Sequence, residues 1–168
     1  MAVIISFLYY AVRMGTPLLF ATTGEVITER AGNLNLGVEG MMAVGAICGY
    51  CLGCFTNSLI IALLAAFVSA ALCAGIYAVL TVTFQTNQTV TGLALTIFGN
   101  GVYLFIGRML TKSGSFPRLS DAEHLQRIVA DNGIPLLRDI PYLGRLLFSY
   151  NIFVYLGIIV AVVCWLYI

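Results

Sequence analysis

Charged residues are the scarcest class in this sequence of 168 residues. They make up 9% of the chain, whereas a soluble globular domain carries about a quarter. The formal net charge is only +1, and no run of basic residues occurs. Proteins that bind nucleic acid neutralise phosphates with clustered Lys and Arg. The sequence therefore gives no indication of nucleic-acid binding.

The residues that common catalytic motifs need are also missing. Lys112 is the single lysine, and Thr111 and Ile106 stand where a phosphate-binding P-loop needs glycines before its Lys-Ser pair. The chain has no H-E-x-x-H, no G-x-S-x-G and no pair of carboxylates within an apolar segment. The sequence therefore predicts neither P-loop ATP binding nor an enzyme, and it indicates no cofactor.

Metal ligands are few. His124 is the only histidine, and no cysteine lies near it in the sequence. The five cysteines all fall in apolar stretches, at positions 48, 51, 54, 73 and 164. The run C-G-Y-C-L-G-C lacks the fourth cysteine and the proline of a ferredoxin-type iron–sulfur run. We therefore predict buried thiols and no metal site.

Hydrophobic residues are abundant, at 61% of the chain with a mean hydropathy of +1.01. A helix that spans a bilayer needs about 20 apolar residues. Five segments approach that length: 2–23, 40–56, 58–84, 89–110 and 152–168. We predict an all-α, polytopic membrane protein whose first segment is a retained span, bent at Pro17.

The stretch 24–39 is polar and glycine-rich, yet it separates the first two apolar segments. Irregular backbone is tolerated at membrane depth only where protein or a water-filled cavity satisfies its hydrogen bonds. The stretch is therefore either a surface connection or part of a solute path.

We expect residues 1–168 to form a single transmembrane domain. Residues 111–150 should be an extramembrane loop with a short interfacial helix, because the sequence from Ser120 to Glu123 resembles a capping box. The last segment is still apolar at Ile168, so we expect a fragment or a shortened product.

Small residues four apart mark one face of the second segment. Gly45, Gly49 and Gly53 follow this spacing, which allows membrane helices to approach closely. We expect this face to pack against another helix.

Polar side chains gather in three places within or beside the apolar segments. The second group is Asn87-Gln88-Thr89 with Thr91, and the third is Gly99-Asn100-Gly101. Each has a plain structural alternative: a salt pair, a turn, or a hydrogen bond between helices. The first group comprises Glu25, Glu29, Arg30, Asn33, Asn35 and Glu39.

The sequence from Thr16 to Ala46 closely resembles the N-terminal signature of permeases of bacterial ABC importers. The resemblance rests on E-R-A-G-N-L-N-L-G-V-E-G-M-M, and it is supported by stretches at 86–96, 140–144 and 151–156. The superfamily includes branched-chain amino acid, ribose and nucleoside permeases. Within it, the chain is most similar to simple-sugar and nucleoside permeases that work with basic-membrane-protein-type binding lipoproteins, and it looks like their N-terminal half.

The resemblance implies a permease subunit in a bacterial plasma membrane, with several partners. These are a separate ABC ATPase pair, a second permease subunit, a lipid-anchored solute-binding protein and a small solute. We expect Asn35 and Glu39 to shape the broken segment, and Asn87, Gln88 and Asn100 to contact the solute or hold its cavity. Amide groups suit a neutral solute such as a nucleoside, although related permeases carry other solutes.

Two indications disagree about the side of the membrane on which residues 111–150 lie. The resemblance implies the outer side, whereas five basic residues in this region predict the cytoplasmic side. We expect the outer side, because a loop that docks a binding protein can use mixed charge. A stand-alone channel or carrier, and a permease fragment that transports nothing, remain alternative functions.

Overall fold

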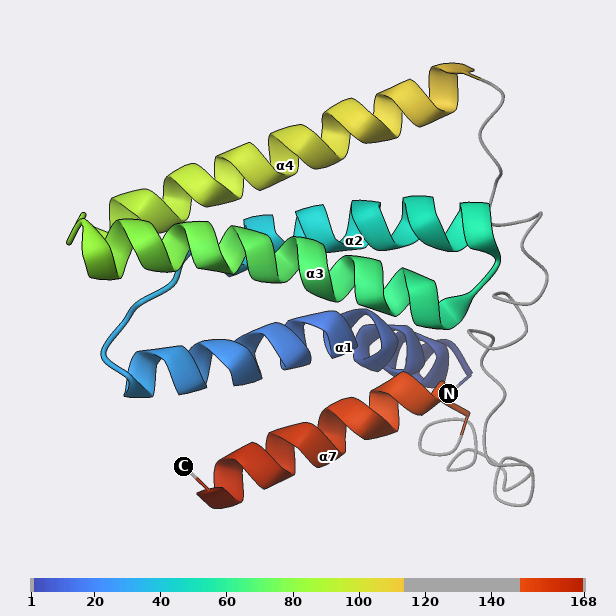
Figure 1. The fold of residues 1–168 in the computed structure, drawn as a ribbon. Coiled ribbons are helices and arrows are strands. Elements are labelled where there is room, and N and C mark those ends of the chain that lie inside the picture. The colour runs from blue at the N-terminus through green and yellow to red at the C-terminus, as the bar shows by residue number, and fades with distance from the viewer. Residues whose placement is uncertain (1, 114–148, 168) are drawn as a thin grey trace. The chain divides into compact units, whose positions relative to one another are not determined.

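The computed structural model describes residues 2–113 and 149–167. All secondary structure in these residues is helical, which confirms the all-α class. Figure 1 shows the helices α1 (Ala2–Arg30), α2 (Val38–Thr56), α3 (Leu59–Ala78), η1 (Val79–Thr83), α4 (Gln88–Ser113) and α7 (Ile152–Tyr167). The predicted interfacial helix, its His124 and residues 114–148 lie outside the described residues.

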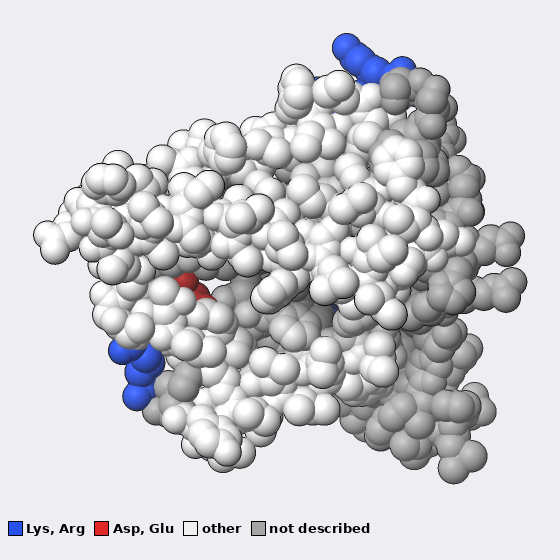
Figure 2. All heavy atoms as spheres, viewed as in Figure 1, with Lys and Arg blue, Asp and Glu red and all other residues white. Residues whose placement is uncertain are grey.

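Four of the helices are long and apolar enough to cross a membrane: Ile4–Arg30, Val38–Thr56, Leu59–Thr83 and Gln88–Lys112. The fifth apolar helix, α7, has 16 residues, so it is about 24 Å long, against about 30 Å of hydrocarbon core. The face drawn in Figure 2 is almost uncharged, and its basic side chains gather near the ends of α1 and α4. The chain is therefore a multi-pass membrane protein.

The first helix is longer than the sequence suggested. α1 runs without interruption from Ala2 to Arg30 and contains Pro17. The buried Thr16 donates its hydroxyl proton to the carbonyl oxygen of Val12, at 3.0 Å, which satisfies this polar side chain inside an apolar helix. The predicted irregular stretch 24–39 is thus too long: residues 24–30 are helical and only 31–37 are not.

The end of α1 explains this difference. The amide of Asn33 donates to the carbonyl of Thr28, and the amide of Gly32 donates to that of Glu29. This pair of bonds is a Schellman motif, which needs a residue in the left-handed region just past the helix. Gly32 supplies it with φ of +84°. The polar residues before Gly32 can therefore stay helical.

The chain divides into two compact units, residues 1–27 with 129–168, and residues 28–128. In the first unit, the buried residues Tyr9, Tyr150 and Val154 form a small core. The rings of Tyr9 and Tyr150 stack with centroids 5.0 Å apart. Gly157 of α7 allows the ring of Phe20 on α1 to approach closely.

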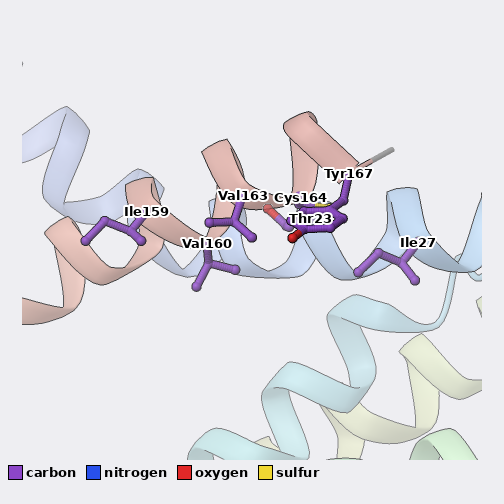
Figure 3. Close-up of a pocket in the computed structure, with 7 residues that line it drawn as sticks. All are labelled: Thr23, Ile27, Ile159, Val160, Val163, Cys164 and Tyr167. Atoms are coloured by element: carbon purple, nitrogen blue, oxygen red, sulfur yellow. The ribbon is translucent and has the colours of Figure 1, made fainter.

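An open groove also lies in the first unit, between α1 and α7 (Figure 3). Thr23 and Ile27 line it from α1, and Ile159, Val160, Val163, Cys164 and Tyr167 from α7. Most of these side chains are apolar, and the hydroxyl of Thr23 donates to the carbonyl of Leu19 in its own helix, at 2.6 Å. This groove suits hydrocarbon better than a polar solute.

In the second unit, α2 packs against α3 and α4 (Figure 1). Its core is formed by Met41 and Val44 of α2 with Cys73 and Tyr77 of α3.

All five cysteines are free thiols, and the described residues contain no cluster of ligands that could hold a metal ion.

Gly45 and Gly49 of α2 face α3. A Cβ atom on Gly45 would lie 3.2 Å from the carbonyl oxygen of Ala66. One on Gly49 would lie 3.0 Å from the carbonyl oxygen of Ala62. Gly53 is buried as well. Helices α2 and α3 therefore approach each other closely along this face.

We predict that Gly49→Leu destabilises the protein. The new side chain would collide with the backbone of α3, and overpacking of this kind costs about 1–3 kcal/mol or more. Thermal unfolding in mild detergent should show a lower midpoint. Gly75→Leu is the matched control, because a Cβ at Gly75 meets no atom within 4 Å. Equal midpoints for the two variants would contradict the packing of α2 on α3.

Candidate functional site

The irregular segment 31–37, here called the loop, connects α1 to α2 within the second unit. Its backbone cannot pair with itself as a helix does, so each buried N–H and C=O group needs another partner. The candidate site consists of this loop and of the polar side chains that reach it from α3, η1 and α4.

Leu34 and Leu36 are held through their backbone atoms. The hydroxyl of Tyr77 donates to the carbonyl of Leu34, at 2.6 Å. The amide of Leu34 donates to Oε1 of Gln88, at 2.8 Å. The hydroxyl of Thr96 donates to the carbonyl of Leu36, also at 2.8 Å. Side chains from α3 and α4 thus satisfy groups that hydrocarbon would leave unpaired.

Asn35 shapes the entry into α2. Its Oδ1 accepts a hydrogen bond from the amide of Gly37, at 2.9 Å, as in an Asx turn. Its Nδ2 points to the sulfur of Met41, at 3.7 Å. Asn35 is buried, with 8% of its surface exposed. The side chain therefore faces the protein and fixes the turn before the helix.

Glycines set how closely α4 approaches the loop and α2. A Cβ on Gly99 would lie 2.3 Å from the carbonyl oxygen of Gly40, and one on Gly40 would lie 2.4 Å from that of Leu95. A Cβ on Gly92 would lie 2.9 Å from the amide nitrogens of Leu36 and Gly37. No larger residue fits at these positions without movement of the backbone. This contact is here called the glycine crossing.

Beyond the crossing, α4 moves away from α2 towards its C-terminal end (Figure 1). A Cβ at Gly101 or at Gly107 meets nothing within 4 Å. Asn100 lies beside the crossing, half-buried, and its side-chain amide forms no hydrogen bond among the described residues. Its amide is therefore not used to hold the loop.

The remaining predicted residues have other positions. Asn87 caps α4, because its Oδ1 accepts from the amide of Val90, at 3.1 Å. Glu39 is exposed in the first turn of α2, where a carboxylate complements the helix dipole. Of the predicted site residues, Asn35 thus lies in the loop and Gln88 bonds its backbone. The other three, Glu39, Asn87 and Asn100, form no hydrogen bond to the loop that the structure shows.

Sequence reasoning missed several residues that hold the loop. Tyr77 and Thr96 are not singled out from the sequence, and Gly99 is named only as part of the polar group Gly99-Asn100-Gly101. One signal was available: Gly92 and Gly99 are seven residues apart, so they share one helix face. Nothing in the sequence pairs Tyr77 with a residue 43 positions away.

We predict that Gly99→Ala disrupts the glycine crossing. A single methyl group would meet the backbone of Gly40, which has no flexible side chain to move aside. The folded yield or thermal midpoint should fall strongly. Gly101→Ala, two residues along the same helix, should change little, because its methyl group enters open space. A stable Gly99→Ala protein would contradict the close approach of α2 and α4.

The sequence has clear relatives. A guanosine ABC transporter permease of Bacillus subtilis is 31% identical over 79% of this chain and 42% of its own length. A nucleoside ABC transporter permease of Lactococcus lactis is 26% identical over 89% of the chain and 47% of its own. A putative glucose ABC transporter permease of Haloferax volcanii is 40% identical over 57% of the chain and 29% of its own length. No solved structure is a significant match.

These matches cover less than half of each relative's length. The family described as the branched-chain amino acid transport system permease component matches residues 7–168, almost the whole chain. The match includes α2, the loop and the glycine crossing. The chain belongs to this family of permease components.

Proposed function

We propose that this chain forms part of the translocation path of an ATP-driven importer for a nucleoside or a related small polar solute. The observation that carries this function is the family match over residues 7–168. The guanosine and nucleoside permeases among the relatives, which align with 79% and 89% of the chain, favour a nucleoside. The activity would belong to an assembly, in which this chain contributes four or more membrane helices.

The loop and the start of α4 are the part of the path that this chain supplies. Asn35 and Glu39 shape the entry to α2, and Gln88 holds the loop backbone at Leu34. Asn87 fixes the start of α4. Asn100 is left to contact the solute. Its amide can both donate and accept a hydrogen bond, and it carries no charge. This chemistry suits the hydroxyl groups and base edges of a nucleoside.

We expect the energy for transport to come from a separate ATPase chain, as the resemblance to ABC importers implies; residues 1–168 contain no P-loop. The partners that fit are a pair of ABC ATPase subunits, a second permease subunit and a lipid-anchored solute-binding protein. The location that fits is a bacterial inner membrane. Each of these components is an expectation from the family and can be tested by isolation of the complex.

A monosaccharide is the second candidate solute. The putative glucose permease of Haloferax volcanii has the higher identity, 40%, although it aligns with only 96 residues. A sugar and a nucleoside both present hydroxyl groups, and only the nucleoside adds a planar base. Direct comparison of guanosine and glucose uptake separates the two.

We predict that Asn100→Leu abolishes uptake and leaves membrane insertion intact. The substitution replaces an amide that forms no hydrogen bond among the described residues with an apolar side chain that branches at the same carbon. Uptake of radiolabelled guanosine, and separately of glucose, is measured in proteoliposomes that contain the purified transporter. Thr111→Val is the control: it is also a polar-to-apolar change on α4, and Thr111 bonds only carbonyls of its own helix. Normal uptake by Asn100→Leu would remove Asn100 from the path.

We also predict that isolation of this chain from its native membrane in mild detergent yields an ABC ATPase, a second permease and a binding lipoprotein. Mass spectrometry of the eluate identifies them. Recovery of the chain alone would contradict the importer, and it would favour a stand-alone carrier or a permease fragment that transports nothing.

A further inference from the structure

The end of α3 departs from α-helical geometry. Residues Val79–Thr83 form a π-helical turn, in which the amide of Phe84 donates to the carbonyl of Val79, at 3.1 Å. The amide and the hydroxyl of Thr86 then both reach the carbonyl of Leu80. A π-turn accommodates one extra residue, and such turns are frequent at functional sites. This turn lies directly beside the loop.

Thr81 is the buried residue of the π-turn, with 7% of its surface exposed. Its hydroxyl donates to the carbonyl of Tyr77, at 2.9 Å. Its oxygen also accepts from Nδ2 of Asn33, at 3.5 Å. The hydroxyl of Tyr77 is 2.6 Å from the carbonyl of Leu34 and 3.5 Å from Oδ1 of Asn33. These contacts form a closed network between α3 and the loop.

The strengths of these contacts differ. The 2.6 Å bond from Tyr77 to Leu34 is short, and Tyr77 is 3% exposed, so water does not compete with it. The two contacts of Asn33, at 3.5 Å, are at the limit for hydrogen bonds and contribute less. Tyr77 precedes the π-turn, whereas Thr81 lies within it. A change of the turn to α-helical register would move Thr81 and leave Tyr77 in place.

We propose that Tyr77, with Thr81 of the π-turn, is a latch that positions the loop for transport. Tyr77 is a positioning residue: it acts on the path through the backbone of Leu34 and does not contact the solute itself. The loop leads into the first turn of α2, so its position determines where α2 begins relative to the glycine crossing. The latch thus connects the end of α3 to the geometry of the site.

The latch is tested by hydrogen–deuterium exchange of residues 31–37, in the transporter with its co-purified subunits in lipid nanodiscs. Tyr77→Phe removes one hydroxyl and keeps the ring that packs in the core with Met41 and Val44. We expect exchange in the loop to rise about three- to tenfold, the range for loss of one net hydrogen bond. Exchange in α2 away from the loop should stay unchanged.

Tyr103→Phe is the matched control, because Tyr103 lies on α4 in the same unit and is 45% exposed. It should leave loop exchange at the wild-type rate. Thr81→Val should raise loop exchange less than Tyr77→Phe, since it breaks only the contact at 3.5 Å to the loop. Wild-type exchange in Tyr77→Phe, or the same rise in Tyr103→Phe, would overturn the latch.

A second readout tests the positioning role and rests on the proposed function. In proteoliposomes, Tyr77→Phe should raise the KM for guanosine about threefold or more and change the maximal rate less, because the solute would bind a site that is ordered only part of the time. Faster exchange with an unchanged KM would keep the latch and overturn its role in transport. Absence of guanosine uptake in the wild type would overturn the proposed solute, and the exchange experiment would still decide the latch.

Discussion

The structure of the second unit depends on one constraint: seven residues of irregular backbone, 31–37, lie among helices that are built for hydrocarbon. Hydrocarbon cannot accept or donate hydrogen bonds, so the protein has to satisfy these backbone groups itself. It does so with side chains from α3 and α4, of which Tyr77, Gln88 and Thr96 bond the backbone of Leu34 and Leu36. Polar residues that look like solute ligands in the sequence are in part used for this purpose.

The glycine crossing makes these bonds possible. The hydroxyl of Thr96 is attached directly to Cβ and has a short reach, so α4 must come close to the loop before Thr96 can bond its backbone. Gly40 and Gly99 allow that approach, since neither carries a side chain at the contact. The outward faces of α3 and α4 are large and apolar, as expected where lipid or other membrane helices cover them. Apolar packing and the polar loop are therefore parts of one arrangement.

Within residues 2–113 and 149–167, the sequence predicted the apolar helices and their order, because each is a long run of hydrophobic residues. It misjudged the break between the first two, since Glu25, Glu29 and Arg30 are polar but helical, and the Schellman motif at Gly32 ends α1 later. It predicted that Asn35 shapes the broken segment and that Gln88 contacts the solute or holds its cavity; in the structure each of the two bonds the loop. Tyr77 could not have been found, because its partner Leu34 is brought to it only by the packing of α2 on α3.

The central claim is that the loop and the glycine crossing form part of a path for a small polar solute. A cryo-electron microscopy structure of the assembled transporter with bound guanosine tests it most directly. The account predicts density for the solute beside Asn100, with the loop still bonded to Tyr77 and Thr96. Solute density remote from α4, or a loop that lies at the membrane surface away from α4, would contradict it.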